Sequence, residues 1–343
     1  MVFRTPHKRL SVVMPAYNAA GTIAAAINSV LRQTDETFEL IVVDDGSLDE
    51  TQRIIHEFQT KDPRVRCLPL PHTGIVAAIN AGIQAANGHY IVRMDADDIM
   101  LPKRLHLQRS FLDTHPNVGL VGSRVEFGGN RGQHLGYAMH VDWINSLITP
   151  HAIALNRFVE SPFAHPSVAF RRELVDAFGG YRDGNFPEDY ELWLRWMDKG
   201  VRMAKCPETL MVWHDPPKRL SRTDPRYAFR AFYHCKAKYL ARWLERINPH
   251  HPKLIVWGAG RETRKRAEYL TQHGIDITAY IDIDPRKIDQ SIAGRPVLAN
   301  TDIPPPDSCF VASYVASRGA RADIRQRLRD RGFTEGNNFI MAA

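Results

Sequence analysis

Short apolar runs alternate with amphipathic stretches over the first hundred residues of the chain. The runs are rich in β-branched side chains, which predicts strands, and the stretches repeat their apolar residues three and four positions apart, which predicts helices. The predicted strands are Leu10–Met14, Phe38–Val43, Val65–Leu70 and Tyr90–Met94, and the predicted helices are Thr22–Arg32, Asp49–Lys61 and Ile75–Asn87. Strand–helix repeats of this kind predict a doubly wound, mostly parallel α/β sheet.

The pattern is less regular after residue 100. It predicts helices over Pro102–His115, Arg172–Phe178 and Asp189–Lys199, strands over Val118–Phe127 and Val168–Phe170, and a glycine-rich loop over Gly128–Gly136. Elsewhere between residues 137 and 185 it predicts no element.

A basic, aromatic helix is predicted from Asp224 to about Ile247. It leads into Asn248-Pro249-His250-His251-Pro252, and such a proline pair is typical of a domain boundary. We therefore predict a large first domain over residues 1–223, a helical connector over residues 224–250 and a small α/β domain over residues 251–343.

Charge and composition narrow the class of protein. Residues 218–250 hold nine basic and two acidic residues, and their net charge equals the +7 of the whole chain. Because the excess positive charge lies in this one segment and does not cover a domain, we do not expect a nucleic-acid partner. The longest apolar runs are far shorter than a membrane span, and the N-terminal residues show no signal-peptide core, so we expect a cytoplasmic protein. The four cysteines are scattered, which disfavours a zinc site or a disulfide framework.

Three acidic groups stand where ligands of a doubly wound sheet bind. Asp44-Asp45 and Asp95-Ala96-Asp97-Asp98 follow predicted strands, and Glu188-Asp189 precedes a predicted helix. Asp95 and Asp97, two positions apart at the end of a strand, can reach one hard divalent cation with oxygen ligands. The simpler alternative for each group is a solvated turn or a helix cap.

These motifs, in this order and spacing, resemble those of the family 2 glycosyltransferases from about Leu10 to Ser221. The resemblance rests on Val13–Asn18, Val43–Ser47, Asn80-Ala81-Gly82, Arg93–Asp98, Pro102–Leu105, Gly179-Gly180-Tyr181 and Glu188–Trp193. It implies the nucleotide-diphospho-sugar transferase fold (GT-A) and an inverting, metal-dependent transfer of a sugar to a hydroxyl, as in polysaccharide biosynthesis. The implied donor is a nucleotide-diphosphate sugar, UDP being the first expectation, and the implied acceptor is a glycan or a lipid-linked glycan.

The resemblance also implies roles for residues of the donor site. Asp95 and Asp97 look like the D-x-D pair that holds Mg²⁺ or Mn²⁺ on the diphosphate, with Asp97 as the direct ligand, and His214 is a further candidate ligand. The other residues expected to bind the nucleotide sugar are Pro15, Ala16, Tyr17, Asn18, Asp44, Asp45, Gly74, Arg93 and Ala96.

On the acceptor side, Asp189 looks like the general base that removes the proton of the attacking hydroxyl, with Glu188 as the alternative base. His165 and Trp193 are expected to line the acceptor pocket.

The chain departs from the common pattern of the family at two positions. His72-Thr73-Gly74 stands where Asn-x-Gly is frequent, and Ala78 stands where an arginine is frequent. Arg93, Arg219 or Arg222 would then supply the phosphate contact, since guanidinium groups match phosphate geometry.

The last third of the chain leaves two roles open: that of the connector helix, and that of the C-terminal module, for which binding of a nucleotide or sugar phosphate, or an interaction role, is favoured over redox chemistry. The connector helix is either a helix packed on a domain or a peripheral contact with the inner membrane surface, where lipid-linked acceptors are found. Leu254–Gly260 followed by a helix resembles a Rossmann-like dinucleotide turn, with Asp282 in the place of the ribose-binding acid, but Thr263 replaces the third glycine.

Two other functions fit parts of the pattern. A sugar nucleotidyltransferase would carry a Gly- and Arg-rich loop near the first strand, and Pro15-Ala16-Tyr17-Asn18 is no such loop. A non-catalytic sensor of nucleotide sugars would need no general base. The presence of the candidate base Asp189 together with Asp95 and Asp97 argues against a sensor.

Overall fold

The computed structural model describes residues 9–216, 219–317 and 319–343. Residues 1–8, which supported the expectation on targeting, lie outside this description. The chain forms two compact units: the first comprises Met1–Ile153, Pro162–Gly184 and Lys199–Thr223, and the second comprises Ala154–Ser161, Asn185–Asp198 and Asp224–Ala343. The predicted division at residue 223 also separates the units, but two segments from the predicted first domain belong to the second unit. The three-domain division stays a prediction.

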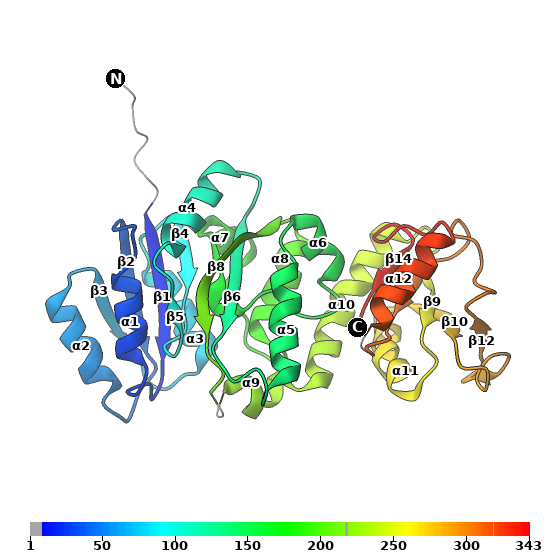
Figure 1. The fold of residues 1–343 in the computed structure, drawn as a ribbon, viewed down its shortest axis with the longest axis horizontal. Coiled ribbons are helices and arrows are strands. Elements are labelled where there is room, and N and C mark those ends of the chain that lie inside the picture. Colours follow the sequence, from blue (N-terminus) through cyan, green and yellow to red (C-terminus); the bar gives the residue numbers. More distant parts are fainter. Residues whose placement is uncertain (1–8, 217–218, 318) are drawn as a thin grey trace, which may run out of the picture. The chain divides into compact units, whose positions relative to one another are not determined.

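The first unit is built on an eight-stranded sheet with the order β3-β2-β1-β4-β7-β6-β8-β5 (Figure 1). Pairing is parallel from β3 to β4 and between β6 and β8, whereas β7 and β5 run antiparallel to their neighbours. The expected mostly parallel sheet is therefore confirmed. The strands are β1 Leu10–Ala16, β2 Phe38–Asp44, β3 Val65–Pro69, β4 Tyr90–Arg93, β5 Ile99–Met100, β6 Leu120–Phe127, β7 Ala169–Arg171 and β8 Met203–Trp213.

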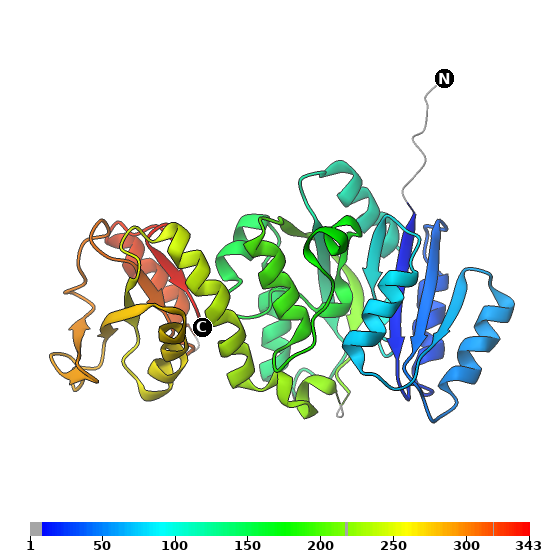
Figure 2. The same cartoon turned by 180° about the vertical axis from the view of Figure 1, so that it is seen from behind.

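Helices cover both faces of this sheet (Figures 1 and 2). Apolar side chains of α1 and α2 share a core with Leu10, Val12 and Met14 of β1. On the opposite face α3 approaches closely, because a Cβ on Gly82 would lie 2.5 Å from Val13 Cγ1. The helices of this region are α1 Ile23–Leu31, α2 Thr51–Lys61, α3 Ile75–Ala85, α4 Arg104–Thr114, α5 Leu135–Ser146, α6 Pro150–Asn156, α7 Glu173–Phe178 and α9 Leu220–Thr223.

Several elements near the centre of the chain were not predicted, of which β8 and α5 are the longest. The long strand β8 carries Lys205 inside the protein, where its ammonium donates to the carbonyls of Ile144 and Pro162 (2.6 Å to the latter). Helix α5 exposes Leu135 and Met139, which blurs its amphipathic pattern. A lysine in a buried strand and apolar residues on a solvated face both depend on neighbours distant in sequence.

The second unit contains a six-stranded sheet with the order β11-β12-β10-β9-β13-β14. Its strands are β9 Lys253–Trp257, β10 Asp276–Asp282, β11 Ser291–Ile292, β12 Arg295–Ala299, β13 Val311–Ser313 and β14 Phe339–Met341. Its helices are α8 Glu188–Asp198, α10 Phe229–Ile247, α11 Arg261–Ala267 and α12 Ala320–Asp330. The predicted helices at 189–199 and 224–247 thus form, the latter beginning with a short 3₁₀ turn at Pro225–Tyr227.

The connector helix α10 is part of the core of this unit. Its residues Tyr233, Leu240 and Leu244 are buried with apolar side chains of β9 and β10. This is the packed-helix interpretation of the connector, and contact with a membrane surface stays a prediction. Among the described residues, no helix is both long and apolar enough to cross a bilayer.

Candidate active site

The carboxylates that follow β4 form a compact acidic cluster. Ligand oxygens of Asp95, Asp97 and Asp98 lie within 4.8 Å of one another. No helix begins at this turn, since β5 follows at Ile99 and α4 only at Arg104, so the alternative of a helix cap does not apply. The cluster stands just beyond the carboxyl end of a central strand, where the sequence predicted it.

The cluster is electrostatically strained. Burial and the charge of Asp95 raise the pKa of Asp97 to about 6, against the opposing fields of Arg219 and His214. Burial, followed by Asp95 and Asp97, raises the pKa of Asp98 well above its ordinary value, although the His214 backbone amide donates to it. Carboxylates held this close favour a bound cation, which cancels their mutual repulsion.

The donor set fits a hard divalent cation. The buried Oδ2 of Asp98 accepts no hydrogen bond from the residues that the structure describes. An all-carboxylate oxygen set with one buried unpartnered atom suits Mg²⁺ or Mn²⁺ rather than a softer metal. Asp98, which the sequence analysis did not include among the metal ligands, belongs to this set, and the signal for it was its place directly after Asp97.

Two buried arginines support the cluster from within the sheet. Arg93 Nη2 donates to Asp95 Oδ1 at 2.6 Å, and its side chain is buried. Arg104 Nη2 in turn donates to the Arg93 carbonyl at 2.8 Å, and burial lowers the pKa of Arg104 to about 9. Arg93 thus orients a carboxylate of the cluster, and its predicted contact with the nucleotide sugar stays a prediction.

The loop after β8 reaches the same cluster. The His214 backbone amide donates to Asp98 Oδ1 at 2.8 Å, and His214 Nδ1 lies 4.0 Å from that oxygen. The Arg219 guanidinium stacks over the Trp213 ring at 4.2 Å and donates to the Tyr137 hydroxyl. His214 and Arg219 therefore stand beside the acidic cluster, and their contacts with a metal or a phosphate stay predictions.

A second layer of side chains holds this loop in place. Buried Asp215 accepts hydrogen bonds from His134 Nδ1 at 2.9 Å and from Arg222 Nη2 at 2.5 Å. His134 and Tyr137 come from the start of α5, so the sequence analysis missed them together with that helix. Arg222 is paired within the loop rather than directed at the cluster.

The ends of β1 and β2 form a second part of the site. The Tyr17 ring stacks on His72 with centroids 4.1 Å apart, and Tyr17 is 44% exposed. Ala16 pairs with Asp44 across the two strands, which brings the predicted nucleotide residues to one edge of the sheet. His72, a departure from the family pattern, is thereby a candidate binding residue that the sequence analysis did not select.

Asp44 and Asp45 make internal hydrogen bonds at this edge. Asp45 accepts from the amides of Thr73 at 2.8 Å and Gly74 at 2.9 Å, and His72 Nδ1 lies 3.1 Å from its Oδ2. Asp44 accepts from the Ser47 amide at 3.2 Å.

Asn18 closes the same corner. It has a positive φ of 48°, and its side-chain oxygen accepts from the Leu48 amide at 2.8 Å. Asp44, Asp45 and Asn18 shape the loops around Tyr17 and His72, and their direct contacts with a nucleotide stay predictions.

The candidate bases lie at the start of α8 in the second unit. Glu188 is buried, and its Oε2 accepts the Tyr227 hydroxyl at 2.6 Å. Asp189 is only half-buried, and its Oδ1 accepts the amide of Tyr190 at 2.7 Å. Of the two carboxylates, Asp189 is the more accessible to an acceptor.

The two predicted acceptor residues differ in exposure. Half-buried His165 makes a hydrogen bond between Nε2 and the Tyr181 hydroxyl at 2.9 Å, and burial, with the nearby Arg93 and Arg219, lowers the pKa of His165 well below its usual range. A neutral His165 is therefore a hydrogen-bonding rather than a charged group. Trp193 is completely buried and presents no surface to a ligand. This burial does not support the predicted contact with the acceptor, which stays a prediction.

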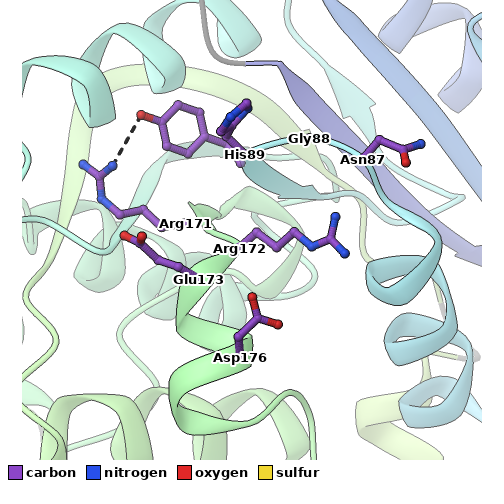
Figure 3. Close-up of a pocket in the computed structure, with 8 residues that line it drawn as sticks. Asn87, Gly88, His89, Arg171, Arg172, Glu173 and Asp176 are labelled. Carbon is purple, nitrogen blue, oxygen red and sulfur yellow. Dashed lines mark hydrogen bonds between the residues drawn. The ribbon is translucent and has the colours of Figure 1, made fainter.

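A hollow of about 270 Å³ lies at the opposite, amino end of β4. Figure 3 shows Arg171, Arg172, Glu173 and Asp176 around it, with Arg171 directed toward the Tyr90 hydroxyl at 3.4 Å. None of the predicted site residues lines this hollow. It is distinct from the carboxyl edge where the acidic cluster stands.

Comparison with known proteins agrees with the geometry of that edge. The model of the family described as Glycosyl transferase family 2 matches residues 11–179. The amylovoran biosynthesis glycosyltransferase AmsE of Erwinia amylovora is 32% identical over 208 residues, which span 59% of this chain and 74% of that protein. This chain belongs to glycosyl transferase family 2.

Other members extend the comparison. The Escherichia coli protein named UDP-Glc:alpha-D-GlcNAc-diphosphoundecaprenol beta-1,3-glucosyltransferase WfgD is 30% identical over 204 residues, 57% of this chain and 73% of that protein. The crystal structure of S. aureus TarS 1-349 superimposes with a TM-score of 0.54 at 19% identity, covering 77% of this chain and 71% of TarS. The family 2 glycosyltransferase thus has the GT-A type of fold that its motifs implied.

Proposed function

We propose that this family 2 glycosyltransferase moves a sugar from a UDP-sugar to a hydroxyl of a glycan or lipid-linked acceptor, with inversion at the anomeric carbon. The observation that carries the proposal is the pairing, on one edge of one sheet, of the acidic cluster with the exposed Tyr17–His72 stack. A ring platform suits a nucleobase, and a cation on the carboxylates suits its diphosphate.

The choice of donor follows from a relative. WfgD is named as a transferase from UDP-glucose to a diphosphoundecaprenol-linked sugar, and 73% of its length aligns with this chain. We carry over the class of donor and acceptor and neither the sugar nor the linkage.

Asp95, Asp97 and Asp98 would hold Mg²⁺ or Mn²⁺. The bound cation would neutralise charge that develops on the departing diphosphate. Arg219, fixed between the Trp213 and Tyr137 rings, adds a positive charge at the same place, and His214 lies beside it. Because Arg219 is already ordered, it stabilises that charge with little reorganisation.

Asp189 is the proposed base. An alcohol is a poor nucleophile, so a carboxylate within hydrogen-bond reach must accept its proton as the new glycosidic bond forms. Glu188 is less suited to act as the base, because it is buried and its Oε2 already accepts a hydrogen bond from the Tyr227 hydroxyl.

The first experiment measures release of nucleoside diphosphate from UDP-, GDP- and dTDP-sugars, with Mn²⁺, Mg²⁺ or EDTA. We expect metal-dependent release from a UDP-sugar, a loss of at least about 100-fold in Asp97→Asn, and no change in Glu57→Gln, which alters an exposed carboxylate on α2. Asp189→Asn should keep donor binding and lose transfer. Donor binding without transfer by the wild type, with every acceptor supplied, would instead favour a sensor.

A further inference from the structure

The second unit contains a large hollow that the proposed transferase reaction does not use. Its volume is about 800 Å³, within the range of small-molecule sites. It lies among α10, α11, the following 3₁₀ helix Glu268–His273, and β10. The lining residues that carry its chemistry are Phe229, Arg230, Arg261, Lys265, Arg266 and Tyr269.

The lining is strongly basic. Five basic side chains (Arg230, Arg261, Arg264, Lys265 and Arg266) and two acidic ones, Glu262 and Glu268, give it a net charge of +3. Within the part of the chain that the structure describes, Arg261 makes no hydrogen bond or ion pair, and Lys265 pairs with Glu262 at 3.2 Å on the surface. Unneutralised guanidinium groups around a concave site favour an anion, phosphate above all.

Aromatic rings form the other part of the wall. Phe229 is 53% exposed, an unusual state for a phenylalanine, and the Arg266 guanidinium lies over its ring at 4.4 Å. Tyr269 lies beside it, and its hydroxyl accepts from Arg230 Nε at 3.3 Å. A half-exposed ring beside guanidinium groups offers a planar, phosphate-bearing ligand both an aromatic contact and a positive charge.

The glycine turn of the same unit is partly filled by side chains of the protein itself. Both oxygens of Asp282 accept internal hydrogen bonds, from the amides of Ala259 and Ile283 at 3.0 and 2.8 Å. The Thr263 side chain fills the space beside Gly258. Asp282, the candidate ribose-binding acid of the sequence pattern, thus already accepts internal hydrogen bonds, and it is not among the residues that line the basic hollow.

We infer that this hollow is a second nucleotide site, which binds a nucleoside diphosphate or a similar planar phosphate ester without a metal ion. The guanidinium groups of Arg261 and Arg266 hold the phosphates, and Phe229 stacks on the ring. Glu262 pairs with Lys265 at 3.2 Å and Glu268 pairs with Arg295 at 3.1 Å, so these carboxylates offset part of the basic charge of the hollow. These carboxylates, in a concave site of limited volume, favour a small polar ligand over an anionic membrane surface.

The site is tested on the full-length protein by calorimetric titration in EDTA, with UDP, GDP, ADP and inorganic pyrophosphate as separate probes. EDTA removes the metal that the proposed donor site needs, so the two nucleotide sites are separated. We expect one saturable, EDTA-insensitive site for at least one nucleotide, weakened 10-fold or more by Arg261→Glu and by Phe229→Ala. Arg286→Glu is the matched control, because it reverses the charge of an exposed arginine of the same unit outside the hollow.

Asp97→Asn separates this inference from the proposed function. It should leave the EDTA-insensitive site unchanged, even if the transferase reaction is not found. The inference is overturned if no nucleotide binds in EDTA, or if Arg286→Glu weakens binding as much as Arg261→Glu. It is also overturned if pyrophosphate binds as tightly as the nucleotides and Phe229→Ala has no effect.

Discussion

At the scale of single residues, the site is defined by which carboxylates are already satisfied. Asp45 is buried and hydrogen-bonded to the Thr73 and Gly74 amides, whereas Asp98 keeps a buried oxygen without a partner among the described residues. Both follow a strand in the sequence, and nothing in their local sequence distinguishes them. This difference in hydrogen bonding makes Asp45 a residue that shapes a loop and leaves Asp98 with an oxygen that could bind a ligand.

The acidic cluster makes a prediction about stability. Because three neighbouring carboxylates repel one another, Asp98→Asn should leave the protein at least as stable as the wild type in EDTA, by ~0–2 kcal/mol. Added Mn²⁺ should raise the melting temperature of the wild type, since a ligand that binds only the folded state stabilises it, and raise that of the variant much less. Thermal unfolding with and without Mn²⁺ measures both. An equal rise in the two proteins would remove Asp98 from the metal site.

The Tyr17–His72 stack makes a prediction about donor affinity. His72→Ala removes one ring of the platform, so KM for the donor should rise about 10-fold with little change in kcat, in line with ~1–3 kcal/mol for a stacked base. Steady-state kinetics of diphosphate release measures this. His56→Ala, on the exposed side of α2, should behave as the wild type. A fall in kcat at constant KM would place His72 elsewhere in the reaction.

At the scale of elements, each strand and helix predicted over the first hundred residues forms within two residues of its predicted ends, because each is amphipathic or uniformly apolar by itself. Strand β8 and helix α5 were missed for the opposite reason. Lys205 is tolerated inside β8 because the carbonyls of Ile144 and Pro162 accept hydrogen bonds from its amino group. The sequence around Lys205 does not reveal these acceptors, which lie far from it in the chain.

Helix α10 provides a test of such a buried cation. Lys236 Nζ donates to the carbonyls of Phe158 at 2.9 Å, Val159 at 3.1 Å and Ala342 at 2.7 Å. Lys236→Met removes these hydrogen bonds, so we expect it to destabilise the protein by ~2–4 kcal/mol. Urea unfolding followed by tryptophan fluorescence measures the loss. A change below ~0.5 kcal/mol would show that the carbonyls find other partners.

The same lysine predicts a pH dependence. Burial lowers the pKa of Lys236 to about 7 in the folded protein, from an ordinary value of 10.5. Between these values the unfolded chain binds more protons, so this group adds stability as pH rises, by at most about 1.4 kcal/mol per pH unit. The difference in unfolding free energy between the wild type and Lys236→Met should therefore be larger at pH 9 than at pH 6.5. A constant difference would contradict the lowered pKa.

At the scale of the whole molecule, each compact unit draws on separated stretches of the chain. Helix α8, which bears Asp189, packs in the core of the second unit, where Tyr190 meets Phe232 and Glu191 accepts the Tyr239 hydroxyl at 2.5 Å. The sequence analysis placed α8 in the first domain because it precedes residue 223. Chain order and folding unit therefore differ at this helix.

This arrangement predicts that a chain cut after residue 223 does not keep α8 in its native state. The cut removes α10, so the apolar face of α8 loses its cover and the fragment should aggregate or exchange the amides of residues 188–198 rapidly. Hydrogen exchange of the fragment and of the full chain measures the difference. Equal protection of α8 in both would show that the first 223 residues fold independently.

By itself, the sequence determined the family, the class of fold and the edge of the sheet that holds the acidic cluster. The class of fold and the edge of the sheet follow from local periodicity, and the family follows from the resemblance of short motifs; all of these are local in the sequence. Only the tertiary structure decided which carboxylates keep an unpartnered oxygen, that His72 stacks on Tyr17, and that α8 and α10 share a core. Those properties depend on hydrogen bonds and packing between residues far apart in sequence, and no local pattern encodes them.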